Sequence, residues 1–122
     1  MTWVHIPFTP GNTDLILLGL KSCTSRQRPK AKTGDFFKVG ERTYVITRVE
    51  SHTLGWVADN LHREEGYPTR EAFIECWNDI ARSMAAQWGE QSKFPFFEEN
   101  IQVWTHFFIP LEEWERVRPM WF

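Results

Sequence analysis

The sequence predicts an α+β fold, a small barrel of paired strands wrapped around helices. Three observations support this class. Segments rich in β-branched and aromatic residues flank a turn at Gly40-Glu41, apolar residues recur at helical spacing from Phe73 to Trp88, and segment 101–111 has the composition of a buried strand. Because 122 residues is an ordinary length for one domain, these elements are expected to form a single domain over residues 1–122.

The first expected elements are a strand over residues 3–8 and a short helix over residues 15–20. A turn over residues 11–14 separates them, and Thr13 or Asp14 can cap the helix with a side-chain oxygen. Lys21 then lies at the carboxyl end of this helix, where the helix dipole favours a positive charge.

A hairpin and a longer helix are expected in the middle of the chain. Segments 35–40 and 42–51 predict two strands paired across the Gly40-Glu41 turn. After a polar stretch, five apolar residues at steps of 4, 3, 4 and 4 share one helix face, namely Phe73, Trp77, Ile80, Met84 and Trp88. Pro68 and Thr69 mark the start of this helix, and Pro110 ends the strand predicted over 101–111.

Composition and charge exclude several classes of protein. No apolar segment approaches the roughly 20 residues of a membrane helix, and the first ten residues lack the pattern of a signal peptide, so a cytoplasmic protein with no membrane partner is expected. The net charge of −2 argues against bulk electrostatic coating of nucleic acid. Cys23 and Cys76 are expected to be reduced thiols.

The usual cofactor motifs are missing. The glycines form neither of the common phosphate-binding loops, which disfavours nucleoside-triphosphate chemistry. The four histidines show no spacing typical of zinc ligands, so neither a metal nor a cofactor is expected. Nothing next to Cys23 marks it as an activated nucleophile, and a small, partly buried thiol is the favoured interpretation.

Three short motifs follow one another in an order that resembles a known family. They are Gly19, Lys21, Thr24 and Arg26; then Gly34-Asp35; then Glu65-Gly66-Tyr67 with Glu71 and Phe73. Together they resemble the ASCH domain family, a branch of the PUA-like β-barrels associated with RNA, over about residues 15 to 109. The chain departs from the family pattern at Ser25, where a β-branched apolar residue is usual, and at Cys23, where threonine is common.

The resemblance implies a PUA-like barrel of the ASCH type, with two or more flanking helices and a central pocket. Some small ASCH proteins are amidohydrolases that act on N4-acetylcytidine, and the resemblance places their catalytic residues on Lys21, Thr24 and Glu65. The residues expected to bind substrate beside them are Arg26, Tyr67 and Glu64. Glu64 is the rival of Glu65, because adjacent acids cannot be ranked by pattern alone, and the match of Glu65-Gly66 with the family motif favours Glu65.

The proposed chemistry is coherent in physical terms. A threonine hydroxyl is a weak nucleophile until a neighbouring base takes its proton. A lysine can be that base only as a neutral amine, a form that burial or a nearby positive charge favours, and Arg26 can help to supply the charge. Glu65 can orient the lysine, accept a hydrogen bond from the cytosine amine or carry a proton to the leaving group, and the sequence leaves these roles open.

A purely structural interpretation of the same residues stays open. Lys21 can serve only the helix dipole, Thr24 can be a turn residue, and Glu65 can belong to an acidic cluster at a helix start. Whether the protein is an enzyme is therefore not decided by its sequence.

Binding without catalysis is the main alternative function. From residue 21 to residue 48 the chain carries eight basic residues against Asp35 and Glu41, so a local basic face can form despite the net charge. An RNA or modified nucleobase would then stack on aromatic side chains such as Tyr67. The residues expected to contact nucleic acid are Arg28, Lys30 and Lys32.

Two further alternatives are a ribonuclease and a protein-interaction module. A ribonuclease would be expected to bind phosphate with the basic segment, but no pair of histidines lies near that segment in the sequence. The interaction module rests on segment 110–122, an aromatic C-terminal extension whose apolar residues are numerous for a small monomer. This extension is expected to dock on its own barrel or on a partner, including a second copy of the chain in a homo-oligomer.

Overall fold

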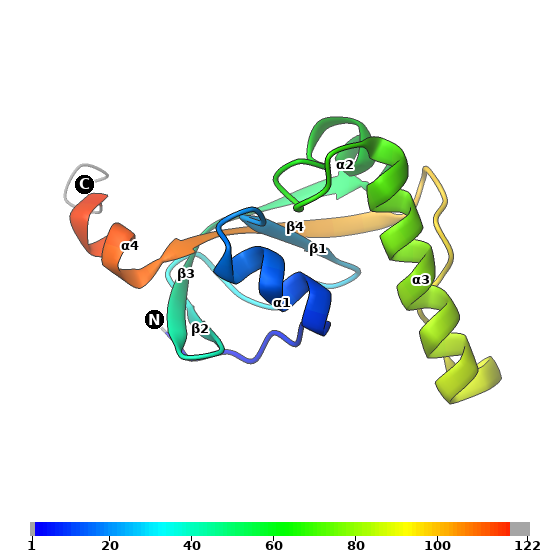
Figure 1. The fold of residues 1–122 in the computed structure, drawn as a ribbon, viewed down its shortest axis with the longest axis horizontal. Coiled ribbons are helices and arrows are strands. Elements are labelled where there is room, and N and C mark those ends of the chain that lie inside the picture. The colour runs from blue at the N-terminus through cyan, green and yellow to red at the C-terminus, as the bar shows by residue number, and fades with distance from the viewer. Residues whose placement is uncertain (1, 118–122) are drawn as a thin grey trace.

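A curled antiparallel sheet of four strands forms the centre of the computed structural model, which describes residues 2–117 (Figure 1). The strands are β1 (Cys23–Arg26), β2 (Phe36–Val39), β3 (Arg42–Thr53) and β4 (Gln102–Pro110), and their order across the sheet is β1-β4-β3-β2. Four α-helices accompany them among these residues: α1 (Pro10–Leu17), α2 (Leu54–Asn60), α3 (Arg70–Trp88) and α4 (Leu111–Val117). The sheet closes half of a barrel, and the predicted α+β class is confirmed.

The long strand β3 gives the sheet its curl. Its first four residues pair with β2, whereas residues from Tyr44 to Thr53 pair with β4. Between Ile46 and Arg48 the register with β4 shifts, an irregularity of the kind that bends a strand and increases its twist. The β2–β3 hairpin is confirmed, and Gly40 at its turn has a φ of 59°, a conformation that favours glycine.

Two groups of buried residues form the core. One packs α1 and the N-terminal segment against the sheet, and it contains Ile6, Ile16, Phe37, Val39, Tyr44, Ile46 and Phe108. The other packs α2 and α3 against the start of β4, and it contains Leu54, Val57, Ala58, Phe73, Trp77 and Val103. The amphipathic helix is thereby confirmed, because the Phe73 and Trp77 side chains face the core one turn apart.

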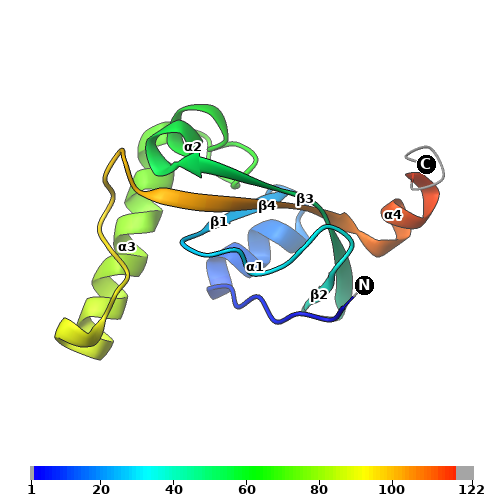
Figure 2. The same cartoon turned by 180° about the vertical axis from the view of Figure 1, so that it is seen from behind.

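The bounds of α3 follow from its caps. Thr69 Oγ1 accepts a hydrogen bond from the backbone N–H of Ala72 at 3.1 Å, which confirms the predicted start. The helix ends at Trp88, and the residue that caps it, Gly89, has a φ of 57°, in the left-handed region that favours glycine. Segment 92–101 then runs back beside α3 to β4, as both ribbon views show (Figure 2). Two hydrogen bonds tie this segment to α3, from Trp77 Nε1 to the Pro95 carbonyl and from the Phe97 N–H to the side chain of Asn78.

The N-terminal elements differ from the prediction. Residues 3–8 form no strand beyond an isolated bridge between Trp3 and Phe36. Helix α1 runs from Pro10 to Leu17. It begins at Pro10 because Thr9 caps it and because proline suits the first helical position, where no intrahelical donor is needed. Lys21 therefore lies beyond the helix and not in its last turn.

Strand β1 and helix α2 are among the elements that the sequence does not predict. Strand β1 has only four residues, and it forms because β4 pairs with it along its whole length. Helix α2 follows β3 directly, where the Thr53 hydroxyl accepts a hydrogen bond from the Trp56 N–H at 3.2 Å. β1 and α2 are each too short for their apolar residues to show the repeat of a strand or a helix.

The C-terminal extension begins as helix α4. Its Trp114 side chain is 5% exposed, so this aromatic residue is buried within the chain itself. Trp121 and Phe122, which the sequence also places in the apolar extension, lie outside the described residues. Among residues 2–117, no helix is long and apolar enough to cross a membrane.

Candidate active site

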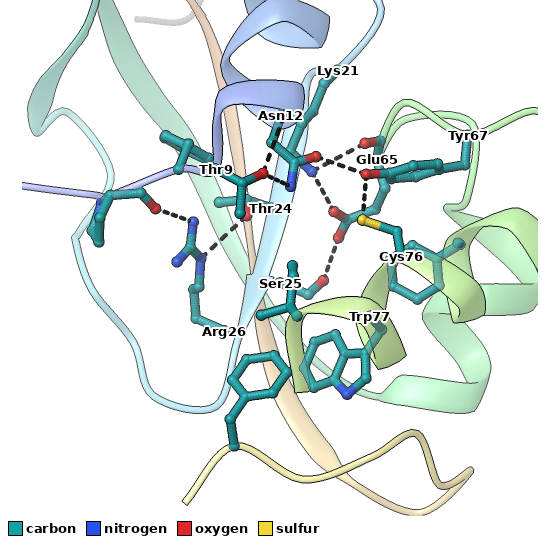
Figure 3. A pocket seen from close by; sticks show the side chains of 15 residues that line it. Thr9, Asn12, Lys21, Thr24, Ser25, Arg26, Glu65, Tyr67, Cys76 and Trp77 are labelled. Carbon is teal, nitrogen blue, oxygen red and sulfur yellow. Dashed lines mark hydrogen bonds and ion pairs between the residues drawn. The ribbon is translucent and has the colours of Figure 1, made fainter. Parts of the chain in front are cut away.

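A cavity of about 120 Å³ lies between the start of α1, strand β1, the segment around Glu65 and the inner face of α3 (Figure 3). Its polar side chains are Thr9, Asn12, Lys21, Thr24, Ser25, Arg26, Glu65, Tyr67 and Cys76. The other lining side chains are apolar and mainly aromatic, namely Pro7, Phe8, Phe73, Trp77, Ile80 and Phe94. A small cavity with a few converging polar groups and aromatic walls is typical of a ligand site.

An ion pair between Lys21 and Glu65 forms the polar centre of the cavity. Lys21 Nζ lies 2.6 Å from Glu65 Oε1 and donates a second hydrogen bond to the Glu65 carbonyl at 3.0 Å. The two residues are 4% and 3% exposed. Taking both charges out of water is costly, and such a pair persists only where geometry and further hydrogen bonds offset the cost.

The backbone around Glu65 decides which of two adjacent acids enters the cavity. The Glu65 N–H bonds the Leu61 carbonyl at 2.9 Å, and Gly66 follows with a φ of 104° that favours glycine. The Glu64 carbonyl accepts hydrogen bonds from the N–H groups of Ser22 and Cys23, which attaches this segment to the start of β1. The Glu64 side chain is exposed and does not line the cavity, whereas that of Glu65 is buried within it.

Ser25 occupies the second oxygen of the Glu65 carboxylate. Its hydroxyl lies 2.7 Å from Glu65 Oε2 and 2.8 Å from the hydroxyl of Thr105 on β4. The sequence interpretation assigned neither residue to the site. The only signal was the unusual serine at a family position that is ordinarily apolar.

Thr24 and Arg26 are joined on strand β1. Arg26 Nε donates to Thr24 Oγ1 at 3.2 Å, and Arg26 Nη2 donates to the Pro7 carbonyl at 2.8 Å. The guanidinium also lies over the Phe8 ring, 5.0 Å from its centroid. Burial lowers the pKa of Arg26 from its ordinary value, and the Glu65 carboxylate opposes this shift. A cation therefore contacts the hydroxyl of the threonine that the resemblance assigns to catalysis.

His106 supports Thr24 from the neighbouring strand. Its side chain is completely buried, and its Nε2 accepts a hydrogen bond from the backbone N–H of Lys30 at 2.9 Å. Its Nδ1 lies 3.3 Å from the Thr24 carbonyl. A backbone N–H can only donate and a carbonyl can only accept, so the ring is neutral with its hydrogen on Nδ1. Burial lowers the pKa of His106, which agrees with this neutral form.

Aromatic side chains form the opposite wall of the cavity. The Tyr67 hydroxyl donates to Asn12 Oδ1 at 2.8 Å and lies 2.7 Å from Cys76 Sγ. Burial, and then the hydrogen bond with Cys76, raise the pKa of Tyr67, so its hydroxyl keeps its proton. The Trp77 and Phe94 rings pack with their centroids 4.7 Å apart. This wall offers flat apolar surfaces to a planar ligand.

The basic residues predicted to contact nucleic acid lie in two places. Arg28 and Lys30 line a second hollow of about 220 Å³, which shares Ser25, Arg26 and Phe94 with the cavity. Lys32 is exposed and lines neither space; its backbone N–H donates to Asp35 Oδ2 at 2.8 Å. The structure thus brings Lys21, Thr24, Glu65, Arg26 and Tyr67 together, with Arg28 and Lys30 adjacent and with Glu64 and Lys32 outside.

Cys23 is a buried thiol on β1. Burial, followed by the charge of Glu65, raises the pKa of the Cys23 thiol, which disfavours the thiolate needed for nucleophilic attack. Over residues 2–117, no three His, Cys, Asp or Glu side chains gather as a metal-binding group.

Comparison with solved structures identifies the fold. No protein-family model and no curated protein matches the sequence. An ASCH domain from Lactobacillus crispatus superposes with a TM-score of 0.64 at 16% identity, over 89% of this chain and 78% of the other. The DUF984 protein from Enterococcus faecalis gives 0.57 at 16% identity, over 90% and 78%. A Pyrococcus furiosus protein solved by NMR gives 0.54 at 17% identity, over 92% and 99%. The chain therefore has the α+β fold of an ASCH domain, as its three ordered motifs predict.

Proposed function

We propose that the cavity binds a nucleobase and that the protein hydrolyses the amide bond of an N4-acylated cytidine. The observation that carries the proposal is the buried Lys21–Glu65 pair, which shares one cavity with the Thr24 hydroxyl. A buried ion pair in a core is commonly neutral or costly for stability, so a catalytic role accounts for its presence better than a structural one.

In the proposed reaction, Thr24 Oγ1 attacks the acyl carbonyl carbon. When the proton shared across the 2.6 Å contact lies on Glu65, Lys21 is a neutral amine able to accept the Thr24 proton. Reaching Thr24 requires Lys21 Nζ to turn away from Glu65, which its flexible stem allows. The C–N4 bond then breaks as Glu65 gives its proton to N4, and water hydrolyses the acyl-threonine to release the carboxylic acid.

Arg26 is proposed to stabilise negative charge at the nucleophile. Its Nε already donates to Thr24 Oγ1, and the guanidinium is held by the Pro7 carbonyl and the Phe8 ring. A positive donor fixed before the reaction starts needs no rearrangement while charge develops on the oxygen.

The dimensions of the cavity favour a small planar ligand. Its volume of about 120 Å³ is below the range of roughly 300 to 1,000 Å³ found for drug-sized ligands. Trp77, Phe94 and Tyr67 supply aromatic surfaces on which a single base can stack. A free nucleoside and a base flipped out of an RNA strand would both present such a group.

The test is to incubate the purified protein with N4-acetylcytidine and with bulkier N4-acylcytidines, and to measure released cytidine by chromatography. We expect Lys21→Ala, Thr24→Ala and Glu65→Gln each to lower kcat/KM by about 10²-fold or more, the usual contribution of a positioned acid or base. Lys38→Ala and Thr33→Ala are matched controls, because both wild-type side chains are exposed and neither lines the cavity.

The two adjacent glutamates give the sharpest comparison. Under the proposal Glu65→Gln loses activity while Glu64→Gln, whose side chain is exposed, keeps it. Circular dichroism of each variant checks that the fold is retained. Full activity of Thr24→Ala or Glu65→Gln would overturn the proposed roles.

A second candidate function, binding of RNA without catalysis, is favoured by the basic hollow beside the cavity. Arg28 and Lys30 lie where the backbone of a strand could run past a bound base. Fluorescence anisotropy with a single-stranded RNA tests this function. We expect Arg28→Ala with Lys30→Ala to weaken binding and to flatten the salt dependence by about 0.7 in log–log slope for each phosphate that these side chains no longer neutralise. An unchanged slope would count against phosphate binding by these residues.

A further inference from the structure

A line of hydrogen bonds runs from the Glu65 carboxylate into the core of the sheet. Ser25 Oγ lies 2.7 Å from Glu65 Oε2, and Thr105 Oγ1 lies 2.8 Å from Ser25 Oγ. Thr105 is completely buried and Ser25 is 8% exposed. Lys21 holds the opposite oxygen, Oε1, so each carboxylate oxygen has its own protein partner.

The order of donation in this line follows from the chemistry of its members. A carboxylate oxygen only accepts hydrogen bonds, so the Ser25 hydroxyl must donate its single hydrogen to Glu65. Ser25 Oγ then has only lone pairs left, and the Thr105 hydroxyl must donate to it. The hydrogen bonds therefore point in one direction, from Thr105 through Ser25 to Glu65.

The sheet sets the position of this line. Ser25 and Thr105 are directly opposite each other in the antiparallel register of β1 and β4, so their side chains project to the same side of the sheet. The β-branched Thr105 side chain is stiff about its first torsion angle and packs in the core. A hydroxyl held between two strands is a more rigid anchor for a glutamate than a loop residue would be.

We propose that Ser25, supported by Thr105, is a positioning residue that holds Glu65 in its orientation toward Lys21. The inference rests on the proposed amidohydrolase function. Two apolar side chains would fill the same space without polar groups to satisfy, so the contact with Glu65 accounts for both hydroxyls. It also gives a role to the serine that departs from the family pattern.

The activity test compares three variants on N4-acetylcytidine. Ser25→Ala removes the donor to Glu65, and we expect kcat to fall about tenfold while KM stays within about twofold, because the single hydrogen of this hydroxyl is donated to Glu65. Ser25→Thr keeps the hydroxyl and is expected to restore most of kcat. Ser22→Ala is the matched control, since Ser22 is exposed and does not line the cavity.

Thr105→Val leaves Ser25 in place and removes only the hydrogen bond from the Thr105 hydroxyl to Ser25. We expect a loss of kcat of about twofold to fivefold, smaller than for Ser25→Ala, again with little change in KM. If Ser25→Ala fails to fold, this second variant carries the test. Unchanged kcat in Ser25→Ala, or in Thr105→Val where only that variant folds, would overturn the inference.

An unfolding measurement separates failure of this inference from failure of the proposed function. Ser25→Ala is made in the wild type and in a background with both charges replaced, Lys21→Met with Glu65→Leu. A destabilisation that is present in the wild type and absent in the background shows coupling between Ser25 and Glu65 and supports the positioning contact. Equal destabilisation in both overturns it. If the wild type releases no cytidine, the proposed function fails. The comparison of unfolding free energies in the two backgrounds then decides whether Ser25 holds Glu65.

Discussion

Lys21 Nζ and Glu65 Oε1 lie 2.6 Å apart although 44 residues separate them in the chain, and both side chains are almost completely buried. Attraction inside the protein offsets the cost of taking two charges out of water only when both partners are present. Removing one partner leaves a buried charge with no counter-ion, whereas removing both takes the two charges out of the interior together.

The first prediction follows from this asymmetry. Lys21→Met is expected to lower the free energy of unfolding by about 3 to 5 kcal/mol, and Lys21→Met combined with Glu65→Leu is expected to recover most of that loss. Urea unfolding followed by circular dichroism measures both. Arg82→Met is the control. Arg82 and its partner Asp79 are both exposed, and an exposed ion pair contributes about 0 to 1 kcal/mol to the free energy of unfolding. A double variant no more stable than Lys21→Met would contradict this account.

The second prediction concerns acid stability. Burial lowers the pKa of His106 below its ordinary value of 6.5 in the folded protein, so the unfolded chain binds a proton more readily. Stability from the neutral ring is therefore present above about pH 6.5 and is lost as the pH falls through and below that value. Unfolding midpoints from pH 8 to pH 5 measure the effect.

The variant His106→Gln cannot titrate and should show a flatter dependence over this range, although its overall stability is lower. His5→Gln is the matched control, because His5 is exposed, and it should keep the wild-type slope. A wild-type midpoint that does not change between pH 8 and pH 5 would show that His106 does not lose stability through protonation.

The third prediction concerns Gly66, which lies between the cavity residues Glu65 and Tyr67 in the chain. A Cβ at this position would lie 3.0 Å from Leu15 Cδ1 and 3.3 Å from Lys21 Cβ, at a φ of 104° that side chains rarely adopt. Gly66→Ala is expected to cost about 1 to 3 kcal/mol of unfolding free energy and to reduce turnover by displacing Lys21.

Gly11→Ala is the contrasting variant. Gly11 lies in α1 with nothing within 4 Å of its added Cβ, so the change should stabilise the protein by about 0.4 to 1 kcal/mol. Thermal unfolding of the two variants side by side gives the comparison. Equal stabilities would refute the special conformation of Gly66.

The fourth prediction distinguishes the two thiols. Cys23 is completely buried with a raised pKa, whereas Cys76 is partly exposed and lines the cavity. A coloured disulfide reagent is expected to react readily with one thiol per native chain and with two in denaturant. Cys76→Ser should abolish the reaction of the native protein. Rapid native reaction in that variant would place the accessible thiol at Cys23 instead.

Strong local patterns predicted the longest elements. Helix α3 was predicted because its apolar residues recur at helical spacing and a threonine precedes it, and both features act within a few residues. The β2–β3 hairpin was predicted for the same reason, from alternation around a glycine turn. Helix α1 begins earlier than the predicted helix over residues 15–20, because Thr9 caps it and Pro10 takes the first helical position.

The sequence by itself determined the ordered motifs, the ASCH-type fold they predict, and the local grouping of Lys21, Thr24 and Arg26, since neighbours within six residues need no long-range contact to lie close. Only the tertiary structure decided between Glu64 and Glu65, because the backbone of that segment, attached to β1, directs one side chain inward and the other to solvent. The same holds for Ser25 and Thr105, whose hydroxyls meet across 80 residues only because β1 pairs with β4 in one register. A contact of that kind depends on the packing of the whole sheet, which no short pattern in the chain contains.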